Sequence, residues 1–325
     1  MDGNIHQPDM VANASHEILE RILCPICGPC PTSLIGTSNR LPVSRCDGCD
    51  LIYVSECPPL NSTHAYFREA HKKDSQSTRI AYVDYRKKSL QREAARIRRL
   101  MPQGGRLLDV GTASGYFLRQ FRRHANWQVE GVEPSRVSAE FARQTFGLNV
   151  HEGFLSDQKF DEAAFDIVCS LDAFGCHRQP REDMLEFHRI LAPGGFLAIE
   201  IPGLWFRMLT SSGWIYRKPA DRTLRLQAGV NFFYYTRATL TRLASVACLE
   251  FVESYPEGLP AAGNRITLTA RKAYDVAAAG LYRATGGHLN LCAKELCIFR
   301  KPVAQIPAVL PVTSDSQSPV YRRAG

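Results

Sequence analysis

Two cysteine pairs near the amino terminus have the residue type and spacing of a metal site. Cys24-Pro-Ile-Cys27 and Cys46-Asp-Gly-Cys49 are CxxC turns separated by 18 residues. Each turn directs two thiolates at one point, and four thiolates form a closed tetrahedral Zn²⁺ site. A closed site has no open coordination position, so the zinc would be structural. Cys30 makes a second CxxC with Cys27, which leaves the choice of ligand open between them.

A second group of chemically suitable residues lies between 106 and 133. An apolar strand carries Asp109 and runs into Gly111-Thr-Ala-Ser-Gly115, and Glu133 closes the next strand. Glycines let a ligand approach the backbone closely. An acid about 20 residues further on can accept hydrogen bonds from ribose hydroxyls. The pattern predicts a cofactor that contains a nucleoside, either a dinucleotide or S-adenosylmethionine.

Three details of the loop favour S-adenosylmethionine. A dinucleotide loop has glycine at its first, third and sixth positions. Here the third position is Ala113, and the sixth is the bulky Tyr116. The carboxylate of Asp109 would repel a pyrophosphate, but it suits the cationic amino group of a methionine moiety.

Around this loop, apolar strands alternate with helical segments. We expect strands at 106–110, 128–133, 165–171, 195–201, 250–253 and 295–300, and helices at 116–124, 135–146, 181–191 and 236–247. Strands separated by helices of this length pair in parallel through right-handed crossovers. The sequence therefore predicts an α/β fold with a doubly wound, Rossmann-like, mostly parallel sheet, preceded by a Cys₄ zinc ribbon.

Four motifs in consecutive order resemble those of class I S-adenosylmethionine-dependent methyltransferases. They are Leu107-Leu-Asp-Val-Gly111 with Gly115-Tyr-Phe-Leu118, then Gly131-Val-Glu133-Pro-Ser135, Phe165-Asp-Ile-Val168 and Leu191-Ala-Pro-Gly-Gly195. The resemblance covers roughly residues 80 to 255. With the zinc ribbon, the chain resembles a group that acts on sugars and other small metabolites.

The resemblance implies a role for each matching position. Asp109, Gly111 and Gly115 would hold the methionine portion, Glu133 the ribose hydroxyls, and Ser170 and Leu171 the sulfonium side. Phe154 and Leu155 would flank the adenine. The expected cofactor-binding residues are Asp109, Gly111, Thr112, Ala113, Gly115, Glu133, Pro134, Phe154, Leu155, Ser170 and Leu171. Ala113 stands where many relatives carry glycine, and one extra methyl group there should be tolerated.

The acceptor side departs from the family pattern. A histidine of the relatives falls on Cys176, and their His-Leu-Tyr-Tyr-Phe pattern reads Asn231-Phe-Phe-Tyr-Tyr235. His177, one residue after the expected position, is our candidate for the general base. Aromatic and cationic residues are interleaved from Trp205 to Tyr235, which suits a planar or sugar substrate with a phosphate or carboxylate.

We expect five parts along the chain. They are a disordered tail (1–20), the zinc ribbon (21–60), a helical connector (61–103), the methyltransferase domain (104–301, with a substrate lid at 204–235) and a second disordered tail (302–325). The polar amino terminus and the lack of long apolar runs predict a cytoplasmic protein without a membrane segment.

The predicted function is methyl transfer to a hydroxyl group of a small, anionic sugar or secondary metabolite. RNA methylation is an alternative, because the net charge is +8 and the ribbon could bind nucleic acid. Against it, residues 24–57 contain only Arg40 and Arg45 as cations, beside three acids. A non-catalytic cofactor-binding protein is the third reading, since both expected histidines are missing. The oligomeric state stays open.

Overall fold

The computed structural model describes residues 19–70, 76–211, 224, 226, 228–258 and 265–303. The predicted tails lie almost wholly outside the described residues, as do residues 212–223 of the predicted lid. Within the first predicted tail, Glu20 is described and pairs with Cys57 in a two-stranded sheet.

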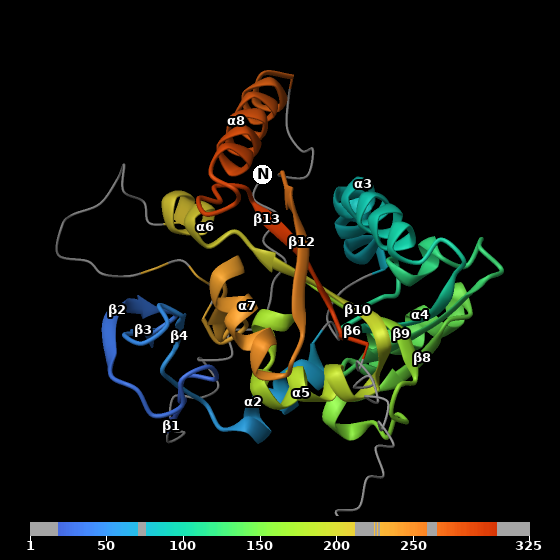
Figure 1. The fold of residues 1–325 in the computed structure, drawn as a ribbon, viewed down its shortest axis with the longest axis horizontal. Coiled ribbons are helices and arrows are strands. Elements are labelled where there is room, and N and C mark those ends of the chain that lie inside the picture. The colour runs from blue at the N-terminus through green and yellow to red at the C-terminus, as the bar shows by residue number, and fades with distance from the viewer. Residues whose placement is uncertain are drawn as a thin grey trace, which may run out of the picture.

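Helices and strands alternate along most of the described chain (Figure 1). The helices are α2 (Leu60–Glu69), α3 (Gln76–Leu100), α4 (Arg136–Phe146), α5 (Pro180–Ile190), α6 (Leu204–Ser211), α7 (Arg237–Val246) and α8 (Arg265–Ala284). The strands are β1 (Glu20–Arg21), β2 (Thr32–Ser38), β3 (Leu41–Cys46), β4 (Ile52–Val54), β5 (Glu56–Cys57), β6 (Gly105–Val110), β7 (Trp127–Glu133), β8 (Asn149–Glu152), β9 (Phe165–Leu171), β10 (Leu191–Pro202), β11 (Phe233–Tyr234), β12 (Glu250–Glu257) and β13 (Lys294–Arg300).

The largest sheet has seven strands in the order β12-β13-β10-β9-β6-β7-β8. The five strands from β8 to β10 are parallel, and β13 and β12 are antiparallel to their neighbours. This confirms the predicted α/β fold with a mostly parallel sheet. The predicted strand at 250–253 is the first half of β12, at one edge of the sheet.

Helices cover both faces of this sheet, and adjacent residues of one strand point to opposite sides. Leu107 and Ile167 pack with α3 and α4, whereas Leu108 and Val168 pack with α5 and α7. Both faces are apolar because the strands are buried on each side, as in other three-layer α/β folds.

The cysteine-rich segment forms a four-stranded sheet in the order β11-β4-β3-β2. Three of these strands come from residues 32–54, but β11 comes from residues 233–234. Figure 1 shows these blue strands beside the orange helix α7. Leu41, Val43 and Leu51 share one hydrophobic cluster with α5 and α7, so the ribbon and the methyltransferase domain are packed through a common core.

The predicted helix at 116–124 is wrong. A 3₁₀ turn at Leu118–Gln120 stands there, flanked by other turns. The backbone bonds run mainly three residues back, from Gln120 to Phe117 and from Phe121 to Leu118. A 3₁₀ turn places residues three apart on one edge. This geometry buries Leu118 and Phe121 together, and tertiary packing overrides the local helical pattern.

Helices α2 and α3 lie in the segment expected to be a helical connector, whereas sequence reasoning missed α6, α8 and the short strands β8 and β11. No helix among the described residues is both long and apolar enough to cross a bilayer.

Candidate functional site

The order of the strands reverses between β6 and β9, and we call the place at the carboxyl ends of these two strands the crevice. The chain runs from β6 outward through β7 to β8 and then returns to β9 on the other side of β6. Loops at the carboxyl ends of two such strands diverge, and ligands of open α/β sheets bind at this switch point. At Gly111, φ is +81° and an added Cβ would lie 2.6 Å from Cβ of Ala173. Only glycine therefore fits where the loops after β6 and β9 meet.

Three side-chain oxygens at this crevice are buried and have no hydrogen-bond partner of ordinary geometry among the described residues, although the Thr112 hydroxyl lies close enough to Asp109 to lower the pKa of its carboxyl. They are Oδ1 of Asp109, Oγ1 of Thr112 and Oγ of Ser170. Buried polar atoms of folded proteins normally have a partner, because an unsatisfied one costs about 1–3 kcal/mol. Three of them at the ends of β6 and β9 indicate that this place is built for binding. All three residues belong to the cofactor set expected from the sequence.

Asp109 is 2% exposed, and burial raises the pKa of its carboxyl to about 7. The nearby hydroxyl of Thr112 lowers this pKa, the negative charge of Glu133 raises it, and the positive charge of Arg86 lowers it. The group therefore changes its charge near neutral pH, and a cation beside it would hold it in the ionised form.

Glu133 ends β7 and organises the glycine loop. Its Oε2 accepts the backbone N–H of Ala113 at 2.8 Å, and its Oε1 accepts that of Ser135 at 2.9 Å. A carboxylate can accept about four hydrogen bonds, so the hydroxyl groups of a ligand could bind Glu133 as well. Ala113 is exposed and has a φ of +48°, so its methyl group is accommodated in a left-handed conformation.

The remaining expected cofactor residues lie around the same crevice. Leu171 ends β9 and is buried, and Leu155 is buried just after the half-exposed Phe154. Pro134 is half-buried after Glu133. The structure thus places the predicted set at the carboxyl ends of β6, β7, β8 and β9.

One wall of the crevice was not expected from the sequence. The imidazole of His64, on α2, stacks on the ring of Phe154 with centroids 3.8 Å apart. Arg68 lies over the same ring at 5.4 Å, and Oγ of Ser135 donates to the carbonyl of Ala70 at 2.6 Å. Burial lowers the pKa of His64, which favours the neutral ring. Helix α2 therefore belongs to the adenine side of the predicted site.

A buried ionic cluster borders the end of β9, and the sequence analysis missed it as well. Asp172, the residue after β9, has a φ of +59°. Its Oδ2 lies 2.7 Å from Nζ of Lys294 and 3.6 Å from Nη1 of Arg86. Although burial opposes ionisation, these two cations lower the pKa of Asp172 to about 2. Lys294 and Arg86 also pair with the buried Glu200, at 3.1 and 2.8 Å.

The fifth member of the cluster is Glu93, on α3. Burial, reinforced by the charge of Glu200, raises the pKa of Glu93 to about 9. With Glu93 protonated at neutral pH, two carboxylates balance two cations. No periodic pattern in the sequence could have predicted this cluster, because its members come from α3, β10, β13 and one loop.

The two positions at which the relatives carry histidines contact each other. Sγ of Cys176 lies 3.7 Å from Oδ1 of Asn231. Burial raises the pKa of Cys176 to about 12, so its thiol is neutral. The positive charge of Arg207, on α6, lowers the pKa of both Asp172 and Cys176.

His177 faces a different set of residues. Its Nδ1 lies 2.8 Å from Oδ2 of Asp183, and its ring packs beside Phe174 and Phe187. The side chain is 14% exposed. The hydrogen bond to a carboxylate places the proton on Nδ1 and leaves Nε2 as an acceptor. The role of His177 as the general base stays a prediction.

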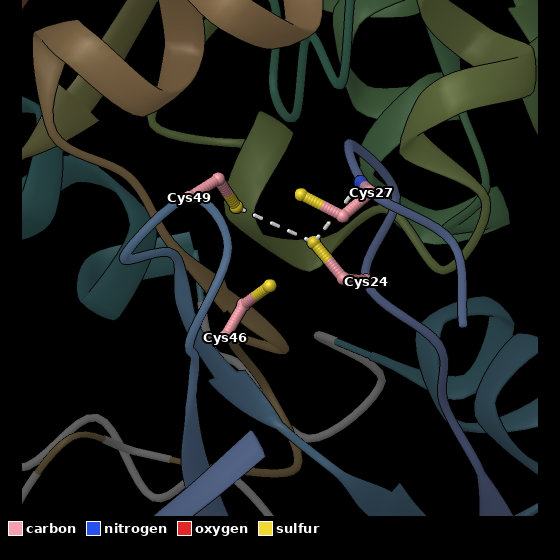
Figure 2. Close-up of side chains that lie close together, drawn as sticks. All are labelled: Cys24, Cys27, Cys46 and Cys49. Atoms are coloured by element: carbon pink, nitrogen blue, oxygen red, sulfur yellow. Dashed lines mark hydrogen bonds between the residues drawn. The ribbon is translucent and has the colours of Figure 1, made fainter. Parts of the chain in front are cut away.

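The four expected metal ligands converge in the ribbon (Figure 2). The sulfur atoms of Cys24, Cys27, Cys46 and Cys49 all lie within 4.8 Å of one another. Although burial opposes ionisation, hydrogen bonds from the backbone at Gly48 and Cys49 lower the pKa of Cys46 to about 7. Such amide bonds favour thiolates, the form that binds metal.

Comparison with known proteins agrees with this geometry. A family profile described as a methyltransferase domain matches residues 82–253, more than half of the chain. The chain belongs to the methyltransferase domain family. This confirms the resemblance to class I S-adenosylmethionine-dependent methyltransferases, although the chain spans little more than a third of the length of the curated relatives it matches.

Individual relatives are distant. A demethylmenaquinone methyltransferase from Chlorobaculum parvum is 29% identical over 91 residues, which are 28% of this chain and 38% of that protein. A putative methyltransferase solved in complex with the Trm112 methyltransferase activator of Haloferax volcanii superposes with a TM-score of 0.50 at 20% identity. That comparison covers 74% of this chain and 97% of the other, and it shows a shared fold. Phosphoethanolamine N-methyltransferase 2 of Haemonchus contortus, solved with S-adenosyl-L-methionine, has a TM-score of 0.49 at 14% identity, covering 76% and 62%.

Proposed function

We propose that this methyltransferase acts on a hydroxyl group of a small sugar or secondary metabolite that bears an anionic group. The observation that carries the proposal is the cation at the acceptor side. The positive charge of Arg207, on α6, lowers the pKa of Asp172, Cys176 and Tyr234. Its guanidinium therefore lies near the end of β9, where the sulfonium side is expected. A guanidinium there suits a carboxylate or phosphate of the acceptor. Arg217 and Lys218, two further cations of the segment from Trp205 to Tyr235, lie outside the described residues.

The attachment of the zinc knuckles to the methyltransferase domain favours a small molecule over RNA. Nη1 of Arg181 donates to the carbonyl of Pro25 at 3.2 Å, and Nη1 of Arg242 donates to that of Cys49 at 3.2 Å. Both knuckles therefore face the methyltransferase domain. Of the two cations within residues 24–57, Arg45 lies 3.9 Å from Asp50. Little positive surface is left for a phosphate backbone.

The crevice fits S-adenosylmethionine, which supplies an electrophilic methyl group when it is bound. Asp109 would pair with the α-ammonium group, and Glu133 would accept the ribose hydroxyls while holding the loop through Ala113. Phe154 and Leu155 would flank the adenine, with His64 closing that side. The unpartnered Oγ of Ser170 lies where β9 meets the sulfonium side.

His177 is the proposed general base for the acceptor hydroxyl. Asp183 holds the imidazole by the hydrogen bond at Nδ1, so Nε2 is the atom that would take the proton. If the acceptor instead loses its proton to water, His177 and Asp183 serve packing alone.

We further propose that the four cysteines hold one structural zinc ion. Tetrahedral Zn–S bonds of about 2.3 Å place the sulfurs about 3.8 Å apart. Sγ of Cys24 and Sγ of Cys49 lie 3.5 Å apart, and all four sulfurs lie within 4.8 Å of one another, so small side-chain adjustments would complete the tetrahedron. Cys30 lies outside the four-sulfur group.

Calorimetry with S-adenosylmethionine and with NAD tests the cofactor assignment, and only the former should bind. The acceptor can then be sought by incubating the protein with S-adenosylmethionine carrying a ¹³C-methyl group and a metabolite extract. Mass spectrometry should find the label on an anionic hydroxylated metabolite. Label on RNA, or on a metabolite without an anionic group, would refute the proposed substrate class.

A further inference from the structure

A segment of the methyltransferase domain forms part of the ribbon sheet. In β11, Phe233 pairs with Tyr53 and Tyr234 pairs with Ile52 of β4. The amide of Val54 donates to the carbonyl of Phe232 at 2.8 Å, which extends the pairing by one residue. The ribbon therefore holds the backbone of this segment as a fourth strand.

The end of β2 holds the residues just before β11. Oγ of the buried Ser38 accepts the backbone N–H groups of Leu226 and Ala228, at 3.2 and 3.3 Å. Nδ2 of Asn39 donates to the carbonyl of Ala228 at 2.9 Å. A single side chain oxygen thus satisfies two backbone donors, which ties the segment to the ribbon at a second place.

On its other side, the same segment contacts the loop after β9. The amide of Phe232 donates to the carbonyl of Gly175 at 2.8 Å, and Asn231 contacts Cys176. An added Cβ at Gly175 would lie 3.0 Å from the carbonyl oxygen of Phe233, so the two backbones are closely packed. Residues 228–235 therefore lie between the ribbon and the loop at 172–177 and are hydrogen-bonded to both. We call this arrangement the clasp.

Arg178, the residue after this loop, binds the carboxyl-terminal end of the ribbon. Nη1 of Arg178 donates to the carbonyl of Pro58 at 2.8 Å, and its guanidinium lies 5.0 Å from the ring centre of Phe232. The Arg178 side chain is only 7% exposed. Burying a guanidinium is unfavourable unless it has hydrogen-bond partners, and the carbonyl of Pro58 at the end of the ribbon is one of the partners that Arg178 has.

The cofactor loop has its own attachment, away from the ribbon. The amides of Gly111 and Thr112 both donate to the carbonyl of Val132, and that of Ala113 donates to Glu133. These partners belong to β7, inside the seven-stranded sheet. Loosening the ribbon therefore does not remove any of these hydrogen bonds.

We propose that the zinc ribbon positions the acceptor side of the active site, by holding residues 228–235 against the loop at 172–177. The ribbon is thus a positioning element for the acceptor and not only an appended fold. The proposal rests on the proposed function for the side on which the acceptor enters. Its test uses the protein alone, so its outcome is separate from whether an acceptor is found.

The sharpest test keeps all the cysteines and breaks only the clasp. Ser38→Ala removes the oxygen that accepts Leu226 and Ala228. Ser33→Ala is the matched control on the same strand, since within the described part of the chain its Oγ bonds the side chain of Asp47 alone, at 2.8 Å on the surface. Both variants should retain the wild-type zinc content by metal analysis and the wild-type calorimetric affinity for S-adenosylhomocysteine.

Hydrogen exchange followed by mass spectrometry then reports on each segment. In Ser38→Ala, amides in 228–235 and 172–177 should exchange at least about tenfold faster, whereas those in 106–118 keep the wild-type rate. Alkylation of Cys176 by iodoacetamide should accelerate by a similar factor, because its thiol is neutral and half-buried in the intact loop. Ser33→Ala should match the wild type in both measurements.

Removing zinc by Cys46→Ser should produce the same pattern more strongly. Wild-type exchange rates in 228–235 and 172–177 after loss of the clasp or of zinc would overturn the proposal. Equal acceleration in 106–118, with loss of S-adenosylhomocysteine binding, would also overturn it. The ribbon would then support the whole domain and not the acceptor side.

Discussion

The titration of Asp109 gives the cofactor assignment a quantitative test. Its carboxyl has a pKa of about 7 because it is buried at the end of β6. An α-ammonium group gains from this carboxyl only when it is ionised, so binding below pH 7 must release a proton. With a pKa near 7, about one carboxyl in eleven is ionised at pH 6 and about ten in eleven at pH 8. The affinity for S-adenosylmethionine should therefore rise about tenfold between these values, or about 1.4 kcal/mol.

Calorimetry from pH 6 to 8, in buffers of different ionisation enthalpy, measures both the affinity and the protons released. Asp109→Asn keeps the shape of the side chain but cannot ionise, so it should bind more weakly and without this pH dependence. Asp161→Asn, at an exposed carboxylate before β9, is the control and should keep the wild-type slope. A flat profile in the wild type, or an unchanged slope in Asp109→Asn, would show that the ammonium group does not pair with Asp109.

The same shift predicts a change in stability without the cofactor. The pKa of Asp109 in the folded protein exceeds the ordinary value of 3.8, so the folded state binds more protons than the unfolded state between pH 4 and 7. Its contribution to stability is greatest below this window and is lost as the pH rises through about 7. Asp109→Asn should therefore unfold at a higher temperature than the wild type at pH 8, and this difference should shrink toward pH 5.

Four further substitutions test the remaining assignments. Glu133→Gln should weaken S-adenosylmethionine binding by about 1–3 kcal/mol, measured by calorimetry, since a charged acceptor of several hydrogen bonds is lost; unchanged affinity would place the ribose elsewhere. Gly111→Ala should abolish cofactor binding, because its Cβ would lie 2.6 Å from that of Ala173, and retained binding would mean that the loops can separate. Cys46→Ser should reduce the zinc content from one per chain to well below one by metal analysis, and full occupancy would make Cys30 a ligand. His177→Ala should lower turnover by about 10²–10⁴-fold with the cofactor affinity intact, and surviving turnover would assign the proton to another group.

The cofactor crevice could be predicted because its signals are local. The strand, the glycine turn and the acid at the next strand end lie within about 30 residues, and the βαβ handedness rule does the rest. The same holds for the cysteines, whose CxxC turns fix the direction of each thiolate pair. Asp109 could even be matched to a cation from its position alone, although its raised pKa needed the burial that only the structure shows.

The clasp at 228–235 could not be predicted, because it joins segments about 180 residues apart in sequence. β11 has only two residues, Phe233 and Tyr234, and so lacks the alternating pattern that announces a strand. Its pairing with β4 is decided by tertiary packing, as are the contacts of His64 with Phe154. The helix expected at 116–124 failed for the related reason that burial of Phe121 outweighed local propensity.

Cys176 and Asn231 replace the two histidines expected from the family pattern, and their contact with each other gives both replacements one physical explanation. Histidines at both places would bring two imidazoles to one point, whereas the neutral thiol and the amide meet there at 3.7 Å. The glycine before Cys176 favours this contact, since an added Cβ at Gly175 would lie 3.0 Å from the carbonyl oxygen of Phe233 and 3.1 Å from Oδ1 of Asn231. An imidazole is larger than a thiol, so we expect a histidine in place of Cys176 to crowd this contact, while His177 faces Asp183. Reverting Cys176 alone to histidine should then disturb packing without restoring a base. Cys176→His should lower the unfolding temperature and speed hydrogen exchange in 228–235, and a variant of wild-type stability would show that the loop keeps room for an imidazole.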